Sequence, residues 1–283
     1  MSHDYDARMM RVVTHISQNP AGDLSLDALA DVAAMSRFHW HRVFQGIMGE
    51  TVAHAVRRIR LHLAAAKLLR DDRPVARIAA EVGYPNLSSF TRAFTNAYGQ
   101  PPAAFRESAR PEHLAVVLVQ PHPKGDTPMF PITIQHRPAL RLAAAFHKGD
   151  YQTCGEAFER VGAIFVTRNL LPHARGMVGV YYDNPAETAP EDLRAHAGMA
   201  VEDGFEIPEG LEEVTLPASR CAILEHKGPY ATLGAAYDAL YGKWLPESGE
   251  EPADLPPYEV YLNDPATTPA TELRTDICLP LKG

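Results

Sequence analysis

Two carboxylates stand next to aromatic residues in the last third of the chain. Glu259 lies in the stretch "YEVY", and Glu225 follows the apolar run "CAIL". A carboxylate among aromatic rings suits a cationic, apolar ligand, because it neutralises the charge while the rings supply cation–π and stacking contacts. On a β-strand, residues two apart point to the same face, so we expect Glu259 and Tyr261 to lie together. The same region adds five rings: Tyr230, Tyr237, Tyr241, Trp244 and Tyr258.

Other interpretations of these residues remain open. Both glutamates could be solvated at a sheet edge, or the surface could contact a partner protein. In a hydrolase, Glu259 would act as a general base while Tyr261 polarised the carbonyl of a reactive compound. The sequence has no Ser-His-Asp pattern, metal-ligand cluster or glycine-rich phosphate loop. His39 and His41 do not share a helix face. We therefore predict no catalytic residue, no metal and no cofactor.

The aromatic region belongs to an internal repeat. The segment "HKGDYQTCGEA" at 147–157 returns as "HKGPYATLGAA" at 226–236, an offset of 79 residues. Downstream, "YYDNPAETAPEDLR" at 181–194 returns as "YLNDPATTPATELR" at 261–274, an offset of 80 residues. Two matching blocks at nearly the same offset indicate a duplicated unit. The residues that differ between the copies then indicate the site: Glu225 replaces Phe146, and Glu259 replaces Gly179.

Each copy has the pattern of a β-α-β-β module. The first strands are "ALRLAAAFH" and "SRCAILEH", and a glycine after each opens the turn into a helix. The second strands are "GMVGVYYD" and "YEVYLN", and the third are "LRAHAGMAV" and "LRTDICLPL". We therefore expect an α+β domain made of two duplicated modules, with a pseudo-twofold axis and a central cleft.

The first part of the chain has helical periodicity. Helices are predicted over 6–18, from Leu26 behind the N-cap Ser25, and from Ser36 onward. In the third of these helices, Trp40, Val43, Phe44 and Ile47 form an apolar stripe at i, i+3, i+4 and i+7. A second face of this helix carries Phe38, His41, Arg42 and Gln45.

The same pattern returns in residues 74–98. Pro74 begins a short helix, Gly83 and Tyr84 supply a turn, and a second helix runs from about Asn86 to Tyr98. Two short helices joined by a tight turn are typical of a helix-turn-helix unit. The helix predicted over 51–70 would be about 30 Å long, close to the ~34 Å of one DNA turn. It can therefore hold two recognition helices at successive major grooves.

At this point the N-terminal segment resembles the AraC/XylS-type DNA-binding domain. The resemblance rests on "SRFHWHRVFQGIMGETV" and "IAAEVGYPNLSSFTRAFTNAYGQPPAAFR". It implies an all-α domain that binds double-stranded promoter DNA through two helix-turn-helix units. By position, the implied DNA contacts are Arg37, Phe38, His41, Arg42, Leu87, Ser88, Ser89, Thr91 and Arg92. In many relatives this domain comes last, whereas here it comes first.

The C-terminal segment resembles the GyrI-like small-molecule-binding domain. The stretches "GVYYDNPAETAPEDLR", "HKGPYATLGAAYDALYGKWLPESG" and "TELRTDICLPLK" carry this resemblance. It implies an effector sensor or, less often, a hydrolase. The predicted ligand-binding residues are Glu259, Trp244, Tyr261, Tyr230 and Glu225.

Length and charge agree with two domains. The chain has 283 residues, and its net charge of −8 is unevenly spread. Residues 1–113 hold 14 basic against 11 acidic residues, whereas residues 114–283 hold 13 against 24. We predict a DNA-binding domain at 1–110, a linker at 111–131 and an effector domain at 132–283.

The expected partners are promoter DNA, a small-molecule effector and RNA polymerase, with no membrane. Three scattered cysteines and the absence of a signal-like start favour the cytoplasm.

Overall fold

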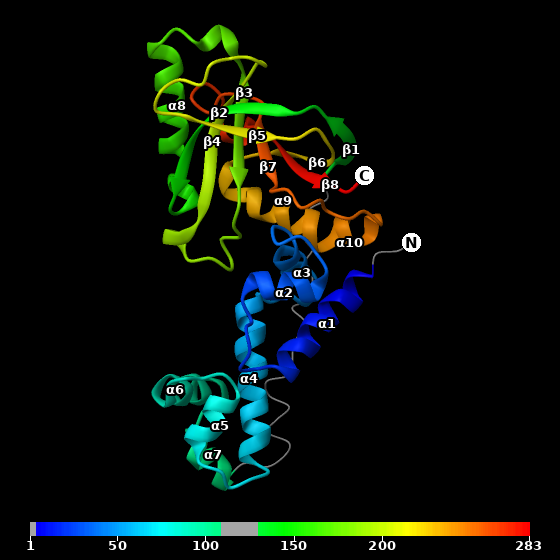
Figure 1. The fold of residues 1–283 in the computed structure, drawn as a ribbon, viewed down its shortest axis with the longest axis vertical. Helices are drawn as coiled ribbons and strands as arrows, with labels where there is room; N and C mark the ends of the chain where they lie inside the picture. Colours follow the sequence, from blue (N-terminus) through cyan, green and yellow to red (C-terminus); the bar gives the residue numbers. More distant parts are fainter. Residues whose placement is uncertain (1–3, 109–129) are drawn as a thin grey trace. The chain divides into compact units, whose positions relative to one another are not determined.

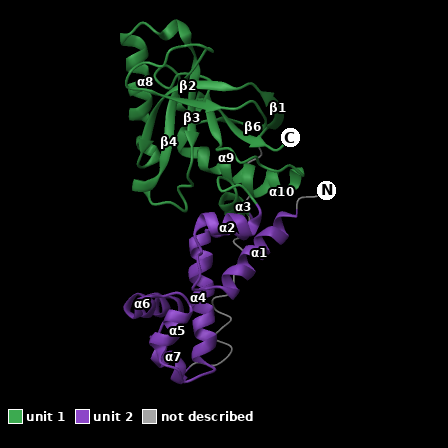
Figure 2. Ribbon diagram, viewed as in Figure 1, with its two compact units in different colours: residues 1–3, 35–46, 125–283 green, residues 4–34, 47–124 purple. Residues whose placement is uncertain are grey.

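The computed structural model describes residues 4–108 and 130–283 (Figure 1). The described chain divides into two compact units (Figure 2). One contains residues 4–34 and 47–108, and the other contains residues 35–46 together with 130–283. Residues 111–129 of the predicted linker lie outside the described residues. The predicted domain boundaries remain a prediction.

The first unit is helical. Its helices are α1 (Tyr5–Gln18), α2 (Leu26–Ala33), α4 (Val52–Leu68), α5 (Val75–Glu81), α6 (Leu87–Tyr98) and α7 (Pro102–Ser108). Ser25 caps α2 as predicted, and Thr51 and Asn86 cap α4 and α6. Each capping side chain accepts hydrogen bonds from backbone N–H groups that would otherwise lack a partner.

A core joins α4 to the three helices that follow it. It contains Leu61, Leu68, Ile78, Val82, Phe90, Phe94 and Phe105, each at most 2% exposed. Phe90 and Phe94 are the buried aromatic residues of α6. Their burial leaves the opposite face of α6 free for polar residues.

Helix α3 (Trp40–Met48) begins later than expected. The carbonyl of Ser36 accepts hydrogen bonds from the backbone N–H groups of His39 and Trp40, so residues 37–39 form a turn before the helix. Trp40, Val43 and Phe44 are fully buried, as the apolar stripe predicts. Residues 35–46 belong to the same compact unit as the C-terminal sheet.

An eight-stranded antiparallel sheet forms the rest of this second unit. Its strands are β1 (Ile132–Arg137), β2 (Leu140–Lys148), β3 (Ala174–Tyr181), β4 (Arg194–Val201), β5 (Glu212–Leu216), β6 (Ser219–Lys227), β7 (Tyr258–Tyr261) and β8 (Arg274–Leu281). The strand order is β1-β6-β8-β7-β3-β4-β2-β5. The order is symmetric about the β7–β3 pair, so the pseudo-twofold axis passes between these two strands.

Helices follow the first long strand of each copy, as predicted. Helix α8 (Gly155–Thr167) contacts β2 and β4, and α9 (Leu233–Ala239) contacts β6. After α9 the chain makes a π-helical turn, Leu240–Trp244, and then the short helix α10 (Leu245–Ser248). These elements confirm the predicted α+β domain behind an all-α region.

Each copy has one more strand than predicted, because β1 and β5 precede the modules. They exchange partners: β1 pairs with β6 of the second copy, and β5 pairs with β2 of the first. The two ladders share one register, from Ile132↔Leu224 to Ala144↔Glu212, with a gap at Pro138–Ala139 and Pro217–Ala218. Proline has no backbone N–H to donate to a strand ladder, so each predicted first strand begins after one of these prolines.

Candidate functional site

Glu259 lies on β7 at the symmetry axis, and its carboxylate is buried. It is 4% exposed. One oxygen accepts a hydrogen bond from the Tyr237 hydroxyl at 3.0 Å, and the other accepts one from the Tyr261 hydroxyl at 2.8 Å. As predicted from their spacing, Glu259 and Tyr261 therefore lie together.

Further tyrosines extend this arrangement; the group formed by Glu259 with Tyr181, Tyr230, Tyr237, Tyr241 and Tyr261 is called the tyrosine cluster below. The hydroxyls of Tyr181 and Tyr261 are 2.7 Å apart. The ring of Tyr230 meets that of Tyr261 edge to face at 5.5 Å, and Tyr237 stacks on Tyr241 at 6.3 Å.

Gly179 makes room for the hydroxyl pair. It is the repeat equivalent of Glu259 and also its direct partner in the β3–β7 ladder. A Cβ atom at Gly179 would lie 2.9 Å from the Tyr261 hydroxyl and 3.0 Å from the Tyr181 hydroxyl. Two glutamates at this pair would face each other across the axis, and like charges that close destabilise a sheet. Only one copy can therefore carry the carboxylate.

Burial controls the protonation of the cluster. It raises the pKa of Glu259 above its ordinary value of 4.5, while the hydrogen bonds from Tyr261 and Tyr237 and the nearby Arg42 charge act in the opposite direction. Burial, and then the Glu259 charge, raises the pKa of Tyr237 and of Tyr261 well above 10. The tyrosines therefore stay protonated and donate to the carboxylate.

Arg42 of α3 brings a cation to the same place. Its guanidinium carbon lies 4.9 Å from the ring centroid of Tyr237 and 5.7 Å from that of Tyr241. Nη2 donates to the backbone carbonyl of Asp183 at 2.8 Å. Nε is buried and has no hydrogen-bond partner among the described residues.

The other predicted ligand residues lie in different places. Tyr230 belongs to the cluster. Trp244 lies at the end of the π-helical turn, and among the described residues its ring makes no contact with a ring of the cluster. Glu225 and Val260 both pair with Asp276 of β8, so their side chains lie on the same face of the sheet. Glu259 is the neighbour of Val260 on β7 and therefore points to the opposite face. Glu225 is ion-paired with Arg274 at 2.7 Å. The structure thus does not bring Glu225 into this site.

Tyr181, Tyr237 and Tyr241 are absent from the predicted ligand-binding residues, although the sequence carries a signal for each of them. Tyr181 and Tyr261 are repeat equivalents, so both copies contribute to the cluster. Tyr237 and Tyr241 are four residues apart and share a helix face. Arg42 had no such signal, because nothing in its neighbourhood indicates a contact almost 200 residues away.

The residues of α6 that were predicted to contact DNA are accessible. Leu87, Ser88, Ser89 and Arg92 are exposed, and Thr91 is half-buried. Leu87 is a large apolar side chain that is 45% exposed. The Asn86 side chain caps the helix by accepting hydrogen bonds from the N–H groups of Ser88 and Ser89.

The corresponding residues near α3 are less accessible. Arg37 is exposed with its guanidinium 5.0 Å from the Phe38 ring, and Phe38 is half-buried. His41 is buried, and burial with the neighbouring Arg42 charge lowers its pKa to about 3. The expectation that His41 and Arg42 present an exposed polar face does not hold in this structure, because His41 faces inward and Arg42 lies against the tyrosines.

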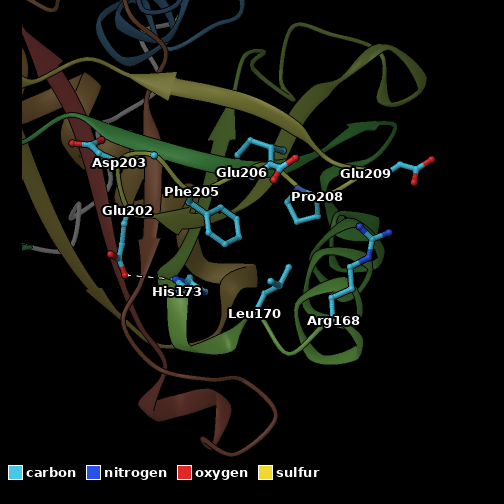
Figure 3. A pocket seen from close by; sticks show the side chains of 11 residues that line it. Arg168, Leu170, His173, Glu202, Asp203, Phe205, Glu206, Pro208 and Glu209 are labelled. Atoms are coloured by element: carbon cyan, nitrogen blue, oxygen red, sulfur yellow. Dashed lines mark ion pairs between the residues drawn. The ribbon is translucent and has the colours of Figure 1, made fainter.

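A separate pocket opens in the first copy, past the end of α8 (Figure 3). Arg168, Leu170, His173 and residues 202–209 line it. Phe205 points into it and lies 5.3 Å from the His173 ring, while several carboxylates stand around the rim (Figure 3). It shares no residue with the tyrosine cluster and contains none of the predicted ligand residues.

Together, these features define a two-part protein in which a helix-turn-helix region is joined to a duplicated α+β domain that holds a buried carboxylate among tyrosines. Residues 130–282 match the GyrI-like small molecule binding domain, and residues 29–108 match a helix-turn-helix domain. The chain therefore belongs to the GyrI-like small molecule binding domain family. Both resemblances predicted from the sequence are confirmed.

Two relatives each match less than half of the chain. The bifunctional transcriptional activator/DNA repair enzyme AdaA of Bacillus subtilis (strain 168) is 32% identical over 108 residues, which are 38% of this chain and 51% of that protein. A DNA gyrase inhibitor of Serratia proteamaculans (strain 568) is 33% identical over 138 residues, 47% of this chain and 87% of that protein. The chain spans about half of the length of AdaA.

Among solved structures, the EcmrR C-terminal domain is similar at 18% identity with a TM-score of 0.45, covering 54% of this chain and 98% of that chain.

Within residues 4–108 and 130–283, no helix is long and apolar enough to cross a membrane.

Proposed function

We propose that this protein is a transcription regulator that binds promoter DNA and senses a small, apolar, cationic molecule. The observation that carries the proposal is the buried Glu259 carboxylate with tyrosine hydroxyls on both oxygens. As a regulator it would act in the cytoplasm and have RNA polymerase as a further partner. The predicted domains, 1–110 for DNA and 132–283 for the effector, are part of this proposal.

A carboxylate in this setting favours a cationic ligand. Removing a charge from water is costly unless a counter-charge or hydrogen bonds compensate for it. Two hydroxyl donors compensate in part, and a cation would complete the compensation. The rings of Tyr230, Tyr237 and Tyr241 add faces on which an aromatic cation can stack.

The DNA side of the proposal rests chiefly on α6. Its first turn exposes Leu87, Ser88 and Ser89, and Arg92 follows on the same helix. Side chains of this kind at a helix N-terminus can contact phosphates and base edges in a major groove. Of the residues predicted for the first helix-turn-helix unit, Arg37 is exposed. Phe38, His41 and Arg42 would contribute only after a change around α3.

We also propose that the site binds its ligand without converting it. Each Glu259 oxygen already accepts a hydrogen bond from a tyrosine hydroxyl, and these bonds favour the charged form and make the carboxylate a weaker base. Burial raises the pKa of the nearby Cys154 thiol to about 11, so this thiol is protonated and a poor nucleophile. Among residues 4–108 and 130–283, no cluster of His, Cys, Asp or Glu is suited to a metal.

The test compares an aryl amidinium with its neutral amide. We expect calorimetry on the full chain to give tighter binding of 2-naphthamidinium than of 2-naphthamide. Glu259→Gln should weaken amidinium binding roughly 10- to 100-fold and change amide binding much less, because it removes a charge-assisted contact. Glu225→Gln is the matched control, since it removes the same charge from the opposite face of the sheet.

The amidinium affinity should also depend on pH. A proton and the ligand compete for the Glu259 carboxylate, so affinity should fall as the pH is lowered through its raised pKa. In Glu259→Gln this dependence should disappear. Equal losses for the amidinium and the amide would contradict the cation proposal, and turnover of a reactive carbonyl compound would contradict a purely binding role.

A further inference from the structure

The side chain that lies against the tyrosine cluster on the α3 side is a cation. Tyr241 is 1% exposed and Glu259 is 4% exposed, whereas Tyr181, Tyr237 and Tyr261 are half-buried and Tyr230 is 38% exposed. A ligand that stacks on the rings of Tyr237 and Tyr241 from the α3 side must take the place of the group that lies on them. Arg42 lies over the rings of Tyr237 and Tyr241. It has the charge, the planar shape and the ring contacts that the proposed effector would need.

We propose that the Arg42 guanidinium is an internal occupant of the effector site, and that the effector is a planar, delocalised cation that takes its place. The inference rests on the proposed function, because it concerns the same site. It adds the ligand class, an amidinium- or guanidinium-like aromatic cation, and the residue that the ligand displaces.

The contacts of Arg42 are suited to exchange. Its guanidinium has one described hydrogen-bond acceptor, the carbonyl of Asp183, while its buried Nε has no partner among the described residues. The Asp183 carboxylate is already paired with Arg194 at 2.8 Å. The Arg42 charge also acts on the carboxyl groups of Glu259 and Asp238, where it opposes the rise in pKa that burial causes. A ligand that brings its own cation to this place would act on the same two carboxyl groups.

Displacing Arg42 would act on the whole of α3. Beside Arg42, the His39 ring bonds to the Tyr241 hydroxyl and to the Leu255 carbonyl, each at 2.8 Å. Gly46 meets the π-helical turn at Gly242, where a Cβ added to Gly46 would lie only 2.3 Å from the Gly242 Cα. Tyr241 belongs to this turn, so a ligand that moves the tyrosine rings also disturbs the surface against which α3 packs.

An internal occupant makes a quantitative prediction. The site binds its ligand only in the fraction of molecules from which Arg42 has withdrawn, so the apparent affinity is reduced by that fraction. Removing the occupant should therefore tighten binding. Arg42→Gln removes the cation, and Arg42→Lys keeps the charge but loses the planar group.

The experiment measures 2-naphthamidinium and 2-naphthamide binding to the full chain by calorimetry. We expect Arg42→Gln to bind the amidinium about tenfold more tightly than the wild type, the order of one desolvated cation–π contact, with Arg42→Lys in between. Gly46→Ala is an independent variant, because alanine favours helix within α3 but collides with Gly242. It should also bind the amidinium more tightly.

Amide hydrogen exchange provides a second measurement. Adding the amidinium to the wild type should speed exchange in residues 40–48, whereas Arg42→Gln should already exchange quickly there without ligand. Unchanged or weaker amidinium binding by Arg42→Gln, or slower exchange of α3 on ligand addition, would overturn the internal-occupant inference and leave the proposed cation site standing. If the wild type and all three variants prefer the amide or bind neither compound, the proposed function itself fails.

Discussion

Gly179 and Glu259 are equivalent residues of the two copies, and they face each other across β3 and β7. This coincidence of sequence symmetry and spatial pairing explains why the site is asymmetric. A side chain at both positions would compete for the space that the Tyr181–Tyr261 hydroxyl pair occupies. A glycine in one copy lets the other copy carry the carboxylate.

Gly179→Ala should disrupt the cluster. The new Cβ would lie 2.8 Å from Cε2 of Tyr181 and 2.9 Å from the Tyr261 hydroxyl, so the rings must move. We expect a loss of about 1–3 kcal/mol in the free energy of unfolding, measured with urea, and weaker amidinium binding.

The matched control is Gly162→Ala, in α8, where no heavy atom lies within 4 Å of the added Cβ. This change should stabilise the chain by up to about 1 kcal/mol, because alanine is the better helix former. Similar destabilisation by both substitutions would refute the packing role assigned to Gly179.

At the scale of elements, the two predicted recognition helices differ. Helix α6 keeps its apolar side in the core with Phe90 and Phe94 and exposes Ser88, Ser89 and Arg92. The α3 region instead uses both sides: His39, just before the helix, bonds to Tyr241, Arg42 bonds to the Asp183 carbonyl, and Trp40 and Phe44 are buried. Of the two predicted recognition helices, α6 is therefore the one whose polar face is exposed.

Arg92→Gln should weaken DNA binding more than a charge loss elsewhere on the helical unit. If Arg92 contacts a phosphate, the slope of log affinity against log salt should decrease by about one. Fluorescence anisotropy over a salt series, on a DNA fragment selected with the full chain, measures both quantities.

Arg11→Gln is the control, since Arg11 is an exposed arginine on α1. Equal salt slopes and affinities for Arg92→Gln and Arg11→Gln would argue against a DNA contact by α6.

For the whole molecule, the placement of Arg42 links the two proposed activities. One guanidinium cannot stack on Tyr237 and reach DNA at the same time, so effector binding and DNA binding would be coupled through it. Coupling of this kind requires that the ligand bind the two states of α3 with different affinity.

We expect 2-naphthamidinium to raise the DNA affinity of the full chain. A fragment of residues 1–113 should bind the same DNA, with an affinity that falls as the salt concentration rises. Its DNA affinity, measured by anisotropy, should not respond to the ligand. DNA binding by a 114–283 fragment that equals that of the full chain would contradict the assignment of DNA binding to the first part.

The sequence by itself determined the kind of protein and most of its elements. Apolar periodicity located α1, α2, α4, α5 and α6, because such patterns report one buried helix face. The repeat revealed the two-copy domain, and the departures from the repeat singled out Glu259 and Glu225. These features depend on neighbours along the chain or on a copy of the same pattern.

The tertiary structure decided what the local pattern could not. Register placed Glu225 on the face away from Glu259, although both replace an uncharged residue of the other copy. Strand exchange gave β1 and β5 partners in the opposite copy. Arg42 and Tyr237 meet across 195 positions of the sequence. Such contacts arise from how distant elements pack, and a side chain's own neighbourhood carries no record of a partner that only folding brings near.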